Sequence, residues 1–392
     1  MPTPRSLLTC LLTLALTACG GGGGDGASNN NGSGGGGVTP PPVSAQTLPL
    51  LNGTSLVGVV YSGTDPAATT TLDAAFAECV AAGADTYQLS VTWASLESAP
   101  GTVDVSTLRT LLTTVHATGL RPYLLLKTID TSTLTLPADL TDPAHADQLA
   151  PGLSFNSPTV ITRFSAVLDQ VVPLLIAQSG FALSVGNEVD PWLATHAAQQ
   201  TPFLAFLDAA RQHAHGLDPR LAITATCTAG ILDTDPTLFA SLLARSDAAC
   251  FTYYPLDATF TVREPTVVAA DLARLVTAAG DRQVLLQEAG YPSGYAPGPG
   301  NGSTLTKQAD FVTAVFTALA AQPRIRFCSF LHLADYTPAD VATFSAYYGS
   351  TAPLFVEFLS TLGLRTSSGA AKPAYQALLN GLGARTPAHG SG

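Results

Sequence analysis

Two glutamates stand directly after short apolar runs, and this placement would suit acid–base and nucleophilic chemistry. Only six of the 28 acidic residues are glutamates. Glu188 follows the run 181–185, and Glu288 follows the run 284–286 after a single glutamine. If both runs are β-strands, both carboxyl groups lie where a strand ends.

Hydrolysis of a glycosidic bond needs two such carboxyl groups. One protonates the leaving oxygen, and in retaining enzymes the other attacks the anomeric carbon from about 5–5.5 Å away. One must stay protonated while the other is ionised, so their surroundings must separate their pKa values. A strand-end glutamate alone could equally cap a loop or pair with an arginine. The parallel placement of Glu188 and Glu288 favours catalysis.

The elements that would position these residues follow an alternating pattern. Short apolar runs alternate with helical patterns, which is typical of βα units around a parallel sheet. The expected strands are 56–60, 86–91, 123–126, 181–185, 221–225, 250–253, 284–286 and 325–331. Eight strands predict an α/β fold of the (β/α)8 TIM barrel class, whereas an open doubly wound sheet usually has fewer. Barrel chemistry occurs at the C-terminal strand ends, where strands four and seven lie nearly opposite.

The N-terminal region is not expected to belong to the fold. Residues 1–18 resemble a signal peptide whose apolar run is too short to span a bilayer. The run ends in Leu-Thr-Ala-Cys, which predicts lipidation of Cys19, although an ordinary cleaved signal is the alternative. Residues 19–45 form a Gly- and Pro-rich linker, residues 46–385 the barrel and residues 386–392 a flexible tail. We therefore expect a bacterial-type lipoprotein, exported and anchored by lipid in the cell envelope.

Composition limits the partners. The net charge is −11 and only three lysines occur, which argues against nucleic acid and leaves carbohydrate substrates open. The sequence contains no Cys-x-x-Cys spacing of the kind that predicts a zinc site, so we expect no metal and no cofactor. Cys79, Cys227, Cys250 and Cys328 could form disulfides or remain as buried thiols. We expect a monomer.

Three motifs resemble clan A glycoside hydrolases, and two of them are similar to the family 17 β-1,3-glucanases. The segment 185–189, Val-Gly-Asn-Glu-Val, matches the acid/base motif of that clan. The segment 287–293, Gln-Glu-Ala-Gly-Tyr-Pro-Ser, resembles the nucleophile segment of family 17. The segment 253–255, Tyr-Tyr-Pro, is similar to the Tyr-Pro element on strand six of the clan. The order of these motifs and their placement on strands agree with the clan across about 230 residues of the barrel.

The resemblance implies roles for individual residues. Glu188 would be the general acid/base and Glu288 the nucleophile. Asn187 would bind the sugar 2-hydroxyl, and Tyr254, or less readily Tyr253, would donate to the nucleophile. Two departures stand out. Tyr291 replaces the usual tryptophan of the nucleophile segment, and His332 with Asp335 stands where many relatives have a tryptophan platform.

Other residues beside the expected strand ends are candidates for contact with substrate. Trp93 and Trp192, the only tryptophans, could stack on sugar rings or simply pack in the core. Lys127 ends strand three and could contact a hydroxyl or a carboxylate at the barrel mouth, or form a salt bridge. Tyr291 and His332 are further candidates, although His332 could equally be a satisfied core histidine. By strand alternation Gln287 should point away from the site, since Glu288 points into it.

The expected function is therefore a retaining glycoside hydrolase that cleaves β-glycosidic bonds in a polysaccharide or oligosaccharide by double displacement. Two alternatives stay open. A glycan-binding lipoprotein could keep the barrel without catalysis, and a transglycosylase would share the covalent intermediate. The sequence leaves open the sugar, the linkage and the choice between endo and exo cleavage.

Overall fold

The computed structural model describes residues 49–51, 55–60, 72–295 and 300–385. The predicted signal peptide, Cys19, the linker to residue 45 and the C-terminal tail lie outside these residues. The barrel strands are β1 (Leu56–Val60), β2 (Thr86–Thr92), β3 (Arg121–Lys127), β8 (Ala182–Ser184), β9 (Ala222–Thr224), β10 (Thr226–Thr228), β11 (Ala249–Tyr253), β12 (Val284–Ala289) and β13 (Ile325–Leu331). The expected strands are all present, within a few residues at each end.

The strands close into a parallel barrel. Their order is β10-β11-β12-β13-β1-β2-β3-β8-β9, and the two outermost members are consecutive pieces of one chain segment interrupted only at Ala225. Because β9 and β10 are halves of one barrel strand, nine sheet members make eight strands in a ring. This confirms the predicted (β/α)8 barrel.

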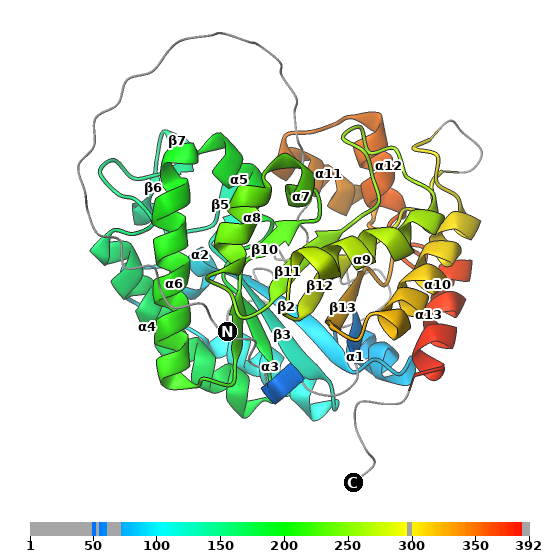
Figure 1. The fold of residues 1–392 in the computed structure, drawn as a ribbon, viewed down its shortest axis with the longest axis horizontal. Coiled ribbons are helices and arrows are strands. Elements are labelled where there is room, and N and C mark those ends of the chain that lie inside the picture. Colours follow the sequence, from blue (N-terminus) through cyan, green and yellow to red (C-terminus); the bar gives the residue numbers. More distant parts are fainter. Residues whose placement is uncertain (1–48, 52–54, 61–71, 296–299, 386–392) are drawn as a thin grey trace.

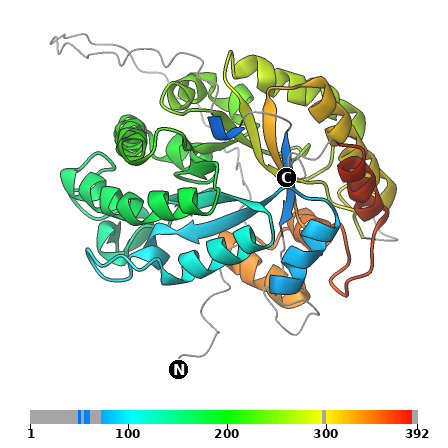
Figure 2. The same ribbon diagram turned by 90° about the horizontal axis from the view of Figure 1, so that it is seen from below.

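Helices surround the barrel as an outer layer, which Figure 2 shows from below. They are α1 (Leu72–Ala81), α2 (Trp93–Leu96), α3 (Ser106–Ala117), α4 (Pro158–Ala177), α5 (Val189–Thr195), α6 (Gln200–Leu217), α7 (Ile231–Thr234), α8 (Pro236–Leu243), α9 (Val268–Ala278), α10 (Leu305–Ala321), α11 (Pro338–Tyr348), α12 (Pro353–Thr361) and α13 (Pro373–Gly383). Short 3-10 helices occur at Pro49–Leu51, Ala138–Leu140, Ala197–Gln199 and Pro265–Val267. By length and hydropathy α4 could cross a membrane, but its apolar side chains are buried in the protein core.

Alternation along each strand separates two apolar cores. On β3, Tyr123 and Leu125 belong to the small cluster inside the barrel, whereas Leu124 and Leu126 belong to the large cluster under the helices. The Tyr123 and Phe327 rings stack inside the barrel with centroids 4.6 Å apart. Strands buried on both faces explain the uninterrupted apolar runs in the sequence.

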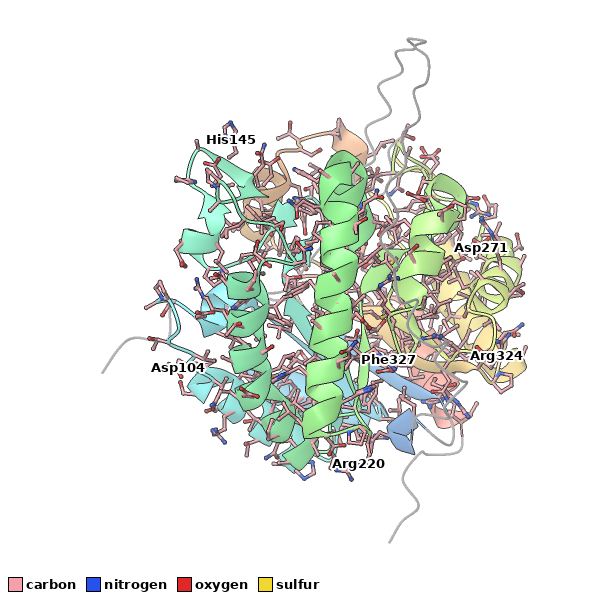
Figure 3. All side chains as sticks on the ribbon, turned by 60° about the vertical axis from the view of Figure 1, so that its left-hand side comes forward. Asp104, His145, Arg220, Asp271, Arg324 and Phe327 are labelled. Carbon is pink, nitrogen blue, oxygen red and sulfur yellow. The ribbon has the colours of Figure 1, made fainter. Side chains whose placement is uncertain are left out.

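Two insertions cover the end of the barrel where the strands finish. After β3, the chain forms two small hairpins from β4 (Ile129–Asp130), β5 (Thr133–Leu134), β6 (Thr141–Asp142) and β7 (His145–Leu149). After β13 it forms α11 and α12, which lie at the upper end of Figure 1 with α5 and α7. Figure 3 shows this polarity, with His145 of β7 at the upper end and Arg220, just before β9, at the lower end.

Candidate active site

Glu188 is held at the end of the fourth barrel strand in a constrained backbone conformation. It caps the start of α5 with φ 42° and ψ 56°, in the left-handed region that non-glycine residues rarely adopt. The strand continues past β8 through hydrogen bonds from Val185 N to Thr224 O and from Thr226 N to Gly186 O. Residues held in such conformations are concentrated at functional sites. Glu188 is only 1% exposed.

Two hydroxyl groups hold the Glu188 carboxyl. Thr252 Oγ1 bonds Oε1 at 2.6 Å and Thr131 Oγ1 bonds Oε2 at 2.8 Å. Burial raises the pKa of Glu188 well above its ordinary value, and the nearby charge of Glu288 raises it further. Because hydroxyls can accept as well as donate, both contacts are compatible with the protonated acid. Glu188 is therefore suited to hold a proton.

Glu288 lies on β12 opposite Thr252, with which it is in register. Thr252 thus links the two carboxyl groups, since it pairs with one residue and hydrogen-bonds the other. The Tyr254 phenol donates to Glu288 Oε2 at 2.7 Å. Gly290 makes room for this phenol, because a Cβ there would stand 2.7 Å from Tyr254 Cε1.

The electrostatics of Glu288 differ from those of Glu188. Burial raises the pKa of Glu288, the Tyr254 hydrogen bond lowers it, Asp130 raises it and Lys127 lowers it. Donation to a carboxylate favours its ionised form. Burial is the largest of these effects, so the pKa of Glu288 is raised as well. Because the Tyr254 phenol donates to Glu288 and not to Glu188, we assign the proton of this coupled pair to Glu188.

Asn187 and Gln287 are hydrogen-bonded across the barrel. Gln287 Nε2 donates to Asn187 Oδ1 at 2.5 Å, and Gln287 Oε1 accepts from Tyr123 and Thr226. The expectation that Gln287 points away from the site is wrong. The register along β11 and β12 passes from Phe251 with Leu286 to Thr252 with Glu288, so Gln287 is the extra residue of a bulge. Bulges re-aim side chains beside active sites, and here both Gln287 and Glu288 face inward.

The loop after β3 brings a further group of polar residues to the site. Lys127 Nζ lies 2.9 Å from Asp130 Oδ2, and both side chains are almost fully buried. Asp130 also accepts from Asn187 Nδ2 at 3.4 Å and from the Tyr347 hydroxyl at 3.0 Å. The predicted site residue Lys127 therefore forms the salt bridge that was one of its two alternatives. Asp130 was not predicted, because it stands four residues beyond the apolar run and is brought inward by pairing of β4 with Asn187.

Three aromatic candidates pack inside the protein instead of facing the site, so for Trp93 and Trp192 the core-packing alternative holds. Trp93 is fully buried between Phe164 and Phe206 in the helical layer, and its indole donates to Glu97. Trp192 is fully buried, with its ring stacked on His196 and its indole bonded to Asp147 O.

Tyr291 is 1% exposed, stacks on Phe311 of α10 and donates to Arg263 O. Of the two tyrosines on the sixth strand, Tyr254 faces the site and Tyr253 donates outward to Asp271.

His332 stands at the end of β13 and is completely buried. Its ring contacts Tyr336 with centroids 4.3 Å apart, and neither ring nitrogen has a hydrogen-bond partner among the described residues. Burial lowers the pKa of His332 to about 3, so the imidazole is neutral. The neighbouring Asp335 is paired with Lys372 at 2.7 Å. Contact of His332 with substrate stays a prediction.

Possible metal ligands and cysteine thiols were also located within the part of the chain that the structure describes. No group of three His, Cys, Asp or Glu side chains there could hold a metal ion. Cys79, Cys227, Cys250 and Cys328 are all buried free thiols. Asp190 bonds the backbone and hydroxyl of Thr228, so it ties α5 to β10 rather than facing a cation.

Several solved structures share this fold. A GH5_18 protein from Bifidobacterium longum subsp. longum ATCC 55813 superposes with a TM-score of 0.64 and 17% identity over 86% of this chain and 81% of that chain. A GH5_18 variant from Streptomyces cattleya in complex with Manβ1-4GlcNAc superposes with a TM-score of 0.64 and 19% identity over 86% of this chain and 82% of that chain. An exo-β-1,4-mannosidase from Opitutaceae bacterium strain TAV5 superposes with a TM-score of 0.62 and 18% identity over 84% of this chain and 59% of that chain. Neither a family model nor a curated protein matches the chain.

Proposed function

We propose that the protein is a retaining β-glycosidase of the clan A type, acting on an oligosaccharide or polysaccharide without a cofactor. The observation that carries this proposal is the unequal environment of two buried carboxyl groups at one barrel end. Glu188 has two hydroxyl partners and a strongly raised pKa, whereas Glu288 accepts a hydrogen bond from Tyr254. This asymmetry suits an acid and a nucleophile.

The mechanism follows from the two positions. Glu288 attacks the anomeric carbon while Glu188 gives its proton to the leaving oxygen, and a glycosyl-enzyme ester results. Loss of charge at Glu288 then removes the repulsion that raised the pKa of Glu188. Glu188 can therefore take a proton from water in the second step, which releases the sugar with its original anomeric configuration.

The motifs and the fold support the same assignment. The segments around Glu188 and Glu288 resemble those of family 17, which implies that Asn187 contacts the sugar 2-hydroxyl. Solved structures with this fold include an exo-β-1,4-mannosidase and a protein bound to Manβ1-4GlcNAc. We therefore propose β-mannosides and β-glucosides as the first substrates to assay, with β-1,3-glucan as the family 17 candidate.

Replacement of the two glutamates tests the proposal. Glu188→Ala should lower hydrolysis of an unactivated substrate by about 10²–10⁴-fold and spare the first step for a good aryl leaving group. Glu288→Ala should be inactive, and azide should restore formation of a glycosyl azide of inverted configuration. The exposed Glu264 provides a matched control, since Glu264→Ala should remain active. Full hydrolysis by either site variant would contradict the proposal, as would inactivity of the wild type on every β-glycan, which is the result expected of a glycan-binding protein.

We also propose that Cys19 carries a lipid that anchors the enzyme in the cell envelope, and that the protein is a monomer. The support for the anchor is the Leu-Thr-Ala-Cys sequence that ends at Cys19 and the flexible linker that follows it. Wild-type protein expressed with its leader in bacterial cells should enter the detergent phase on phase separation, and Cys19→Ser should remain in the aqueous phase. A wild-type protein found only in the aqueous phase would contradict the anchor.

A further inference from the structure

A cavity of about 320 Å³ opens on one side of the catalytic pair. Glu188, Thr252 and Tyr254 line its inner end, whereas Glu288 does not contribute to it. Its outer parts come from α5, from the segment 228–234 and from the segment 256–260. The volume lies within the lower range for small-molecule sites.

The position of Glu188 identifies which part of a substrate would occupy the cavity. This step rests on the proposed function, in which Glu188 protonates the oxygen of the departing sugar. The departing sugar must therefore lie on the Glu188 side, and the sugar that becomes attached to Glu288 lies on the other. A cavity that contains the acid but not the nucleophile is placed to receive the leaving group.

Within the described part of the chain, four carboxyl groups and no basic side chain line the cavity. Besides Glu188, its lining contains Asp190, Asp233 and Asp257, and none of its described lining residues is Lys, Arg or His. Asp190 is engaged by Thr228, and Asp257 accepts from the backbone and hydroxyl of Thr259. Both carboxylates are thus held in place by neutral donors and keep their acceptor character.

Asp233 has the one cationic partner among these carboxylates. Arg274 of α9 bonds it through two nitrogens, so the guanidinium is directed at Asp233 instead of into the cavity. Leu256, Ala258 and Phe260 supply an apolar surface beside the acids. A pyranose ring could place its apolar face there and donate its hydroxyls to the carboxylates.

We propose that this cavity binds the departing sugar and selects neutral or amino-substituted sugars over uronic acids. A uronate carboxylate would enter an acidic cavity without a cation to pair with it, which is unfavourable. A hydroxyl or an ammonium group finds acceptors in the same place.

Partition of the glycosyl-enzyme among sugar acceptors tests this selectivity. A 4-nitrophenyl β-glycoside that the enzyme cleaves serves as donor, and D-glucose, D-glucosamine and D-glucuronate, which share one ring configuration, compete with water. Transfer to glucose and glucosamine should exceed transfer to glucuronate by about tenfold or more, which corresponds to 1.4 kcal/mol. Equal transfer to all three acceptors would overturn the proposal.

Asp233→Asn sharpens the test, because it removes one carboxylate and leaves Arg274 unpaired beside the cavity. It should reduce discrimination against glucuronate about two- to fivefold, in keeping with an exposed pair, when transfer to glucuronate is measured relative to transfer to glucose. Asp208→Asn is the matched control, since it makes the same charge change on α6 away from the cavity. Equal effects of both variants would assign the selectivity to the net charge of the protein and overturn the proposal.

Failure of the proposed function gives a different result. If no β-glycoside is cleaved, the glycosidase proposal fails, and the cavity is then tested by binding alone. Saturation-transfer NMR with the same three sugars should still show contact with glucose and glucosamine but not with glucuronate. Contact with glucuronate at least as strong as with glucose would contradict the charge selectivity.

Discussion

Gln287 fixes the orientation of the Asn187 amide. The glutamine oxygen accepts from the Tyr123 and Thr226 hydroxyls, so its nitrogen must face Asn187, where it donates to Oδ1. Asn187 therefore presents its Nδ2 hydrogens to Asp130 and to the mouth of the barrel. An asparagine held in this way can donate to a sugar hydroxyl without reorganisation when the transition state forms.

Gln287→Glu should lower kcat about tenfold or more while KM changes little. The new carboxylate oxygen would oppose Asn187 Oδ1 and turn the amide over, so the donor to the sugar 2-hydroxyl would be lost. A 2-deoxy glycoside separates this effect from general damage, because it lacks the hydroxyl in question. The variant and the wild type should cleave the 2-deoxy substrate at similar rates. Equal losses on both substrates would show that Gln287 only stabilises the fold.

Tyr254→Phe should move the acidic limb of the kcat/KM pH profile to higher pH. The phenol donates to Glu288 and lowers its pKa, so its removal raises that pKa, and the nucleophile becomes protonated at a higher pH. Activity should therefore fall most at the acid end. Tyr253→Phe is the matched control, since that hydroxyl bonds Asp271 outside the barrel. An unchanged acidic limb in Tyr254→Phe would show that the phenol does not lower the pKa of the nucleophile.

The barrel could be predicted from the sequence because its strands are buried on both faces and therefore appear as continuous apolar runs. The same local patterns placed Glu188 and Glu288 at the strand ends. The bulge at Gln287 could not be predicted, because it depends on how β12 pairs with β11 and leaves no trace in apolar periodicity. Asp130 was missed for a similar reason, since only the pairing of β4 with Asn187 brings it inward.

The sequence could not decide between sugar stacking and core packing for the two tryptophans, because proximity to a strand end does not fix the direction of a side chain. Trp93 begins α2 and turns outward into an aromatic cluster with Phe164 and Phe206, which lie on helices distant in sequence. Trp192 follows Glu188 by four residues, one turn of α5, and packs against Phe155 from the loop that precedes α4. Such partners become apparent only when tertiary packing is known, so an aromatic residue near a site is a weak indicator of sugar binding.

Lys127→Met should destabilise the protein by about 3–5 kcal/mol. The lysine and Asp130 form a buried ion pair, and removal of the cation leaves an uncompensated buried carboxylate. The double variant Lys127→Met/Asp130→Asn should recover part of this loss, because both charges are absent. Lys307→Met, which breaks an exposed pair with Glu264, should cost no more than about 1 kcal/mol. Chemical denaturation measures the free energy of unfolding of all three variants. A loss of stability in Lys127→Met as small as that in Lys307→Met would show that water reaches Asp130.

Glu188→Gln should inactivate the enzyme yet raise its thermal stability above pH 5. Burial and the charge of Glu288 raise the folded-state pKa of Glu188 above its unfolded value, so the wild type loses stability as pH rises from the unfolded pKa towards the folded one. Glutamine cannot ionise and can still bond the Thr131 and Thr252 hydroxyls, so the variant avoids that loss. Thermal denaturation at pH 7 should show an increase of a few degrees, which should vanish below about pH 4, where the unfolded carboxyl is protonated as well. Glu264→Gln, on the surface, should change the melting temperature at neither pH. A melting temperature of Glu188→Gln that falls at pH 7 would show that the ionised carboxylate is bound favourably, and would assign the proton of the pair to Glu288.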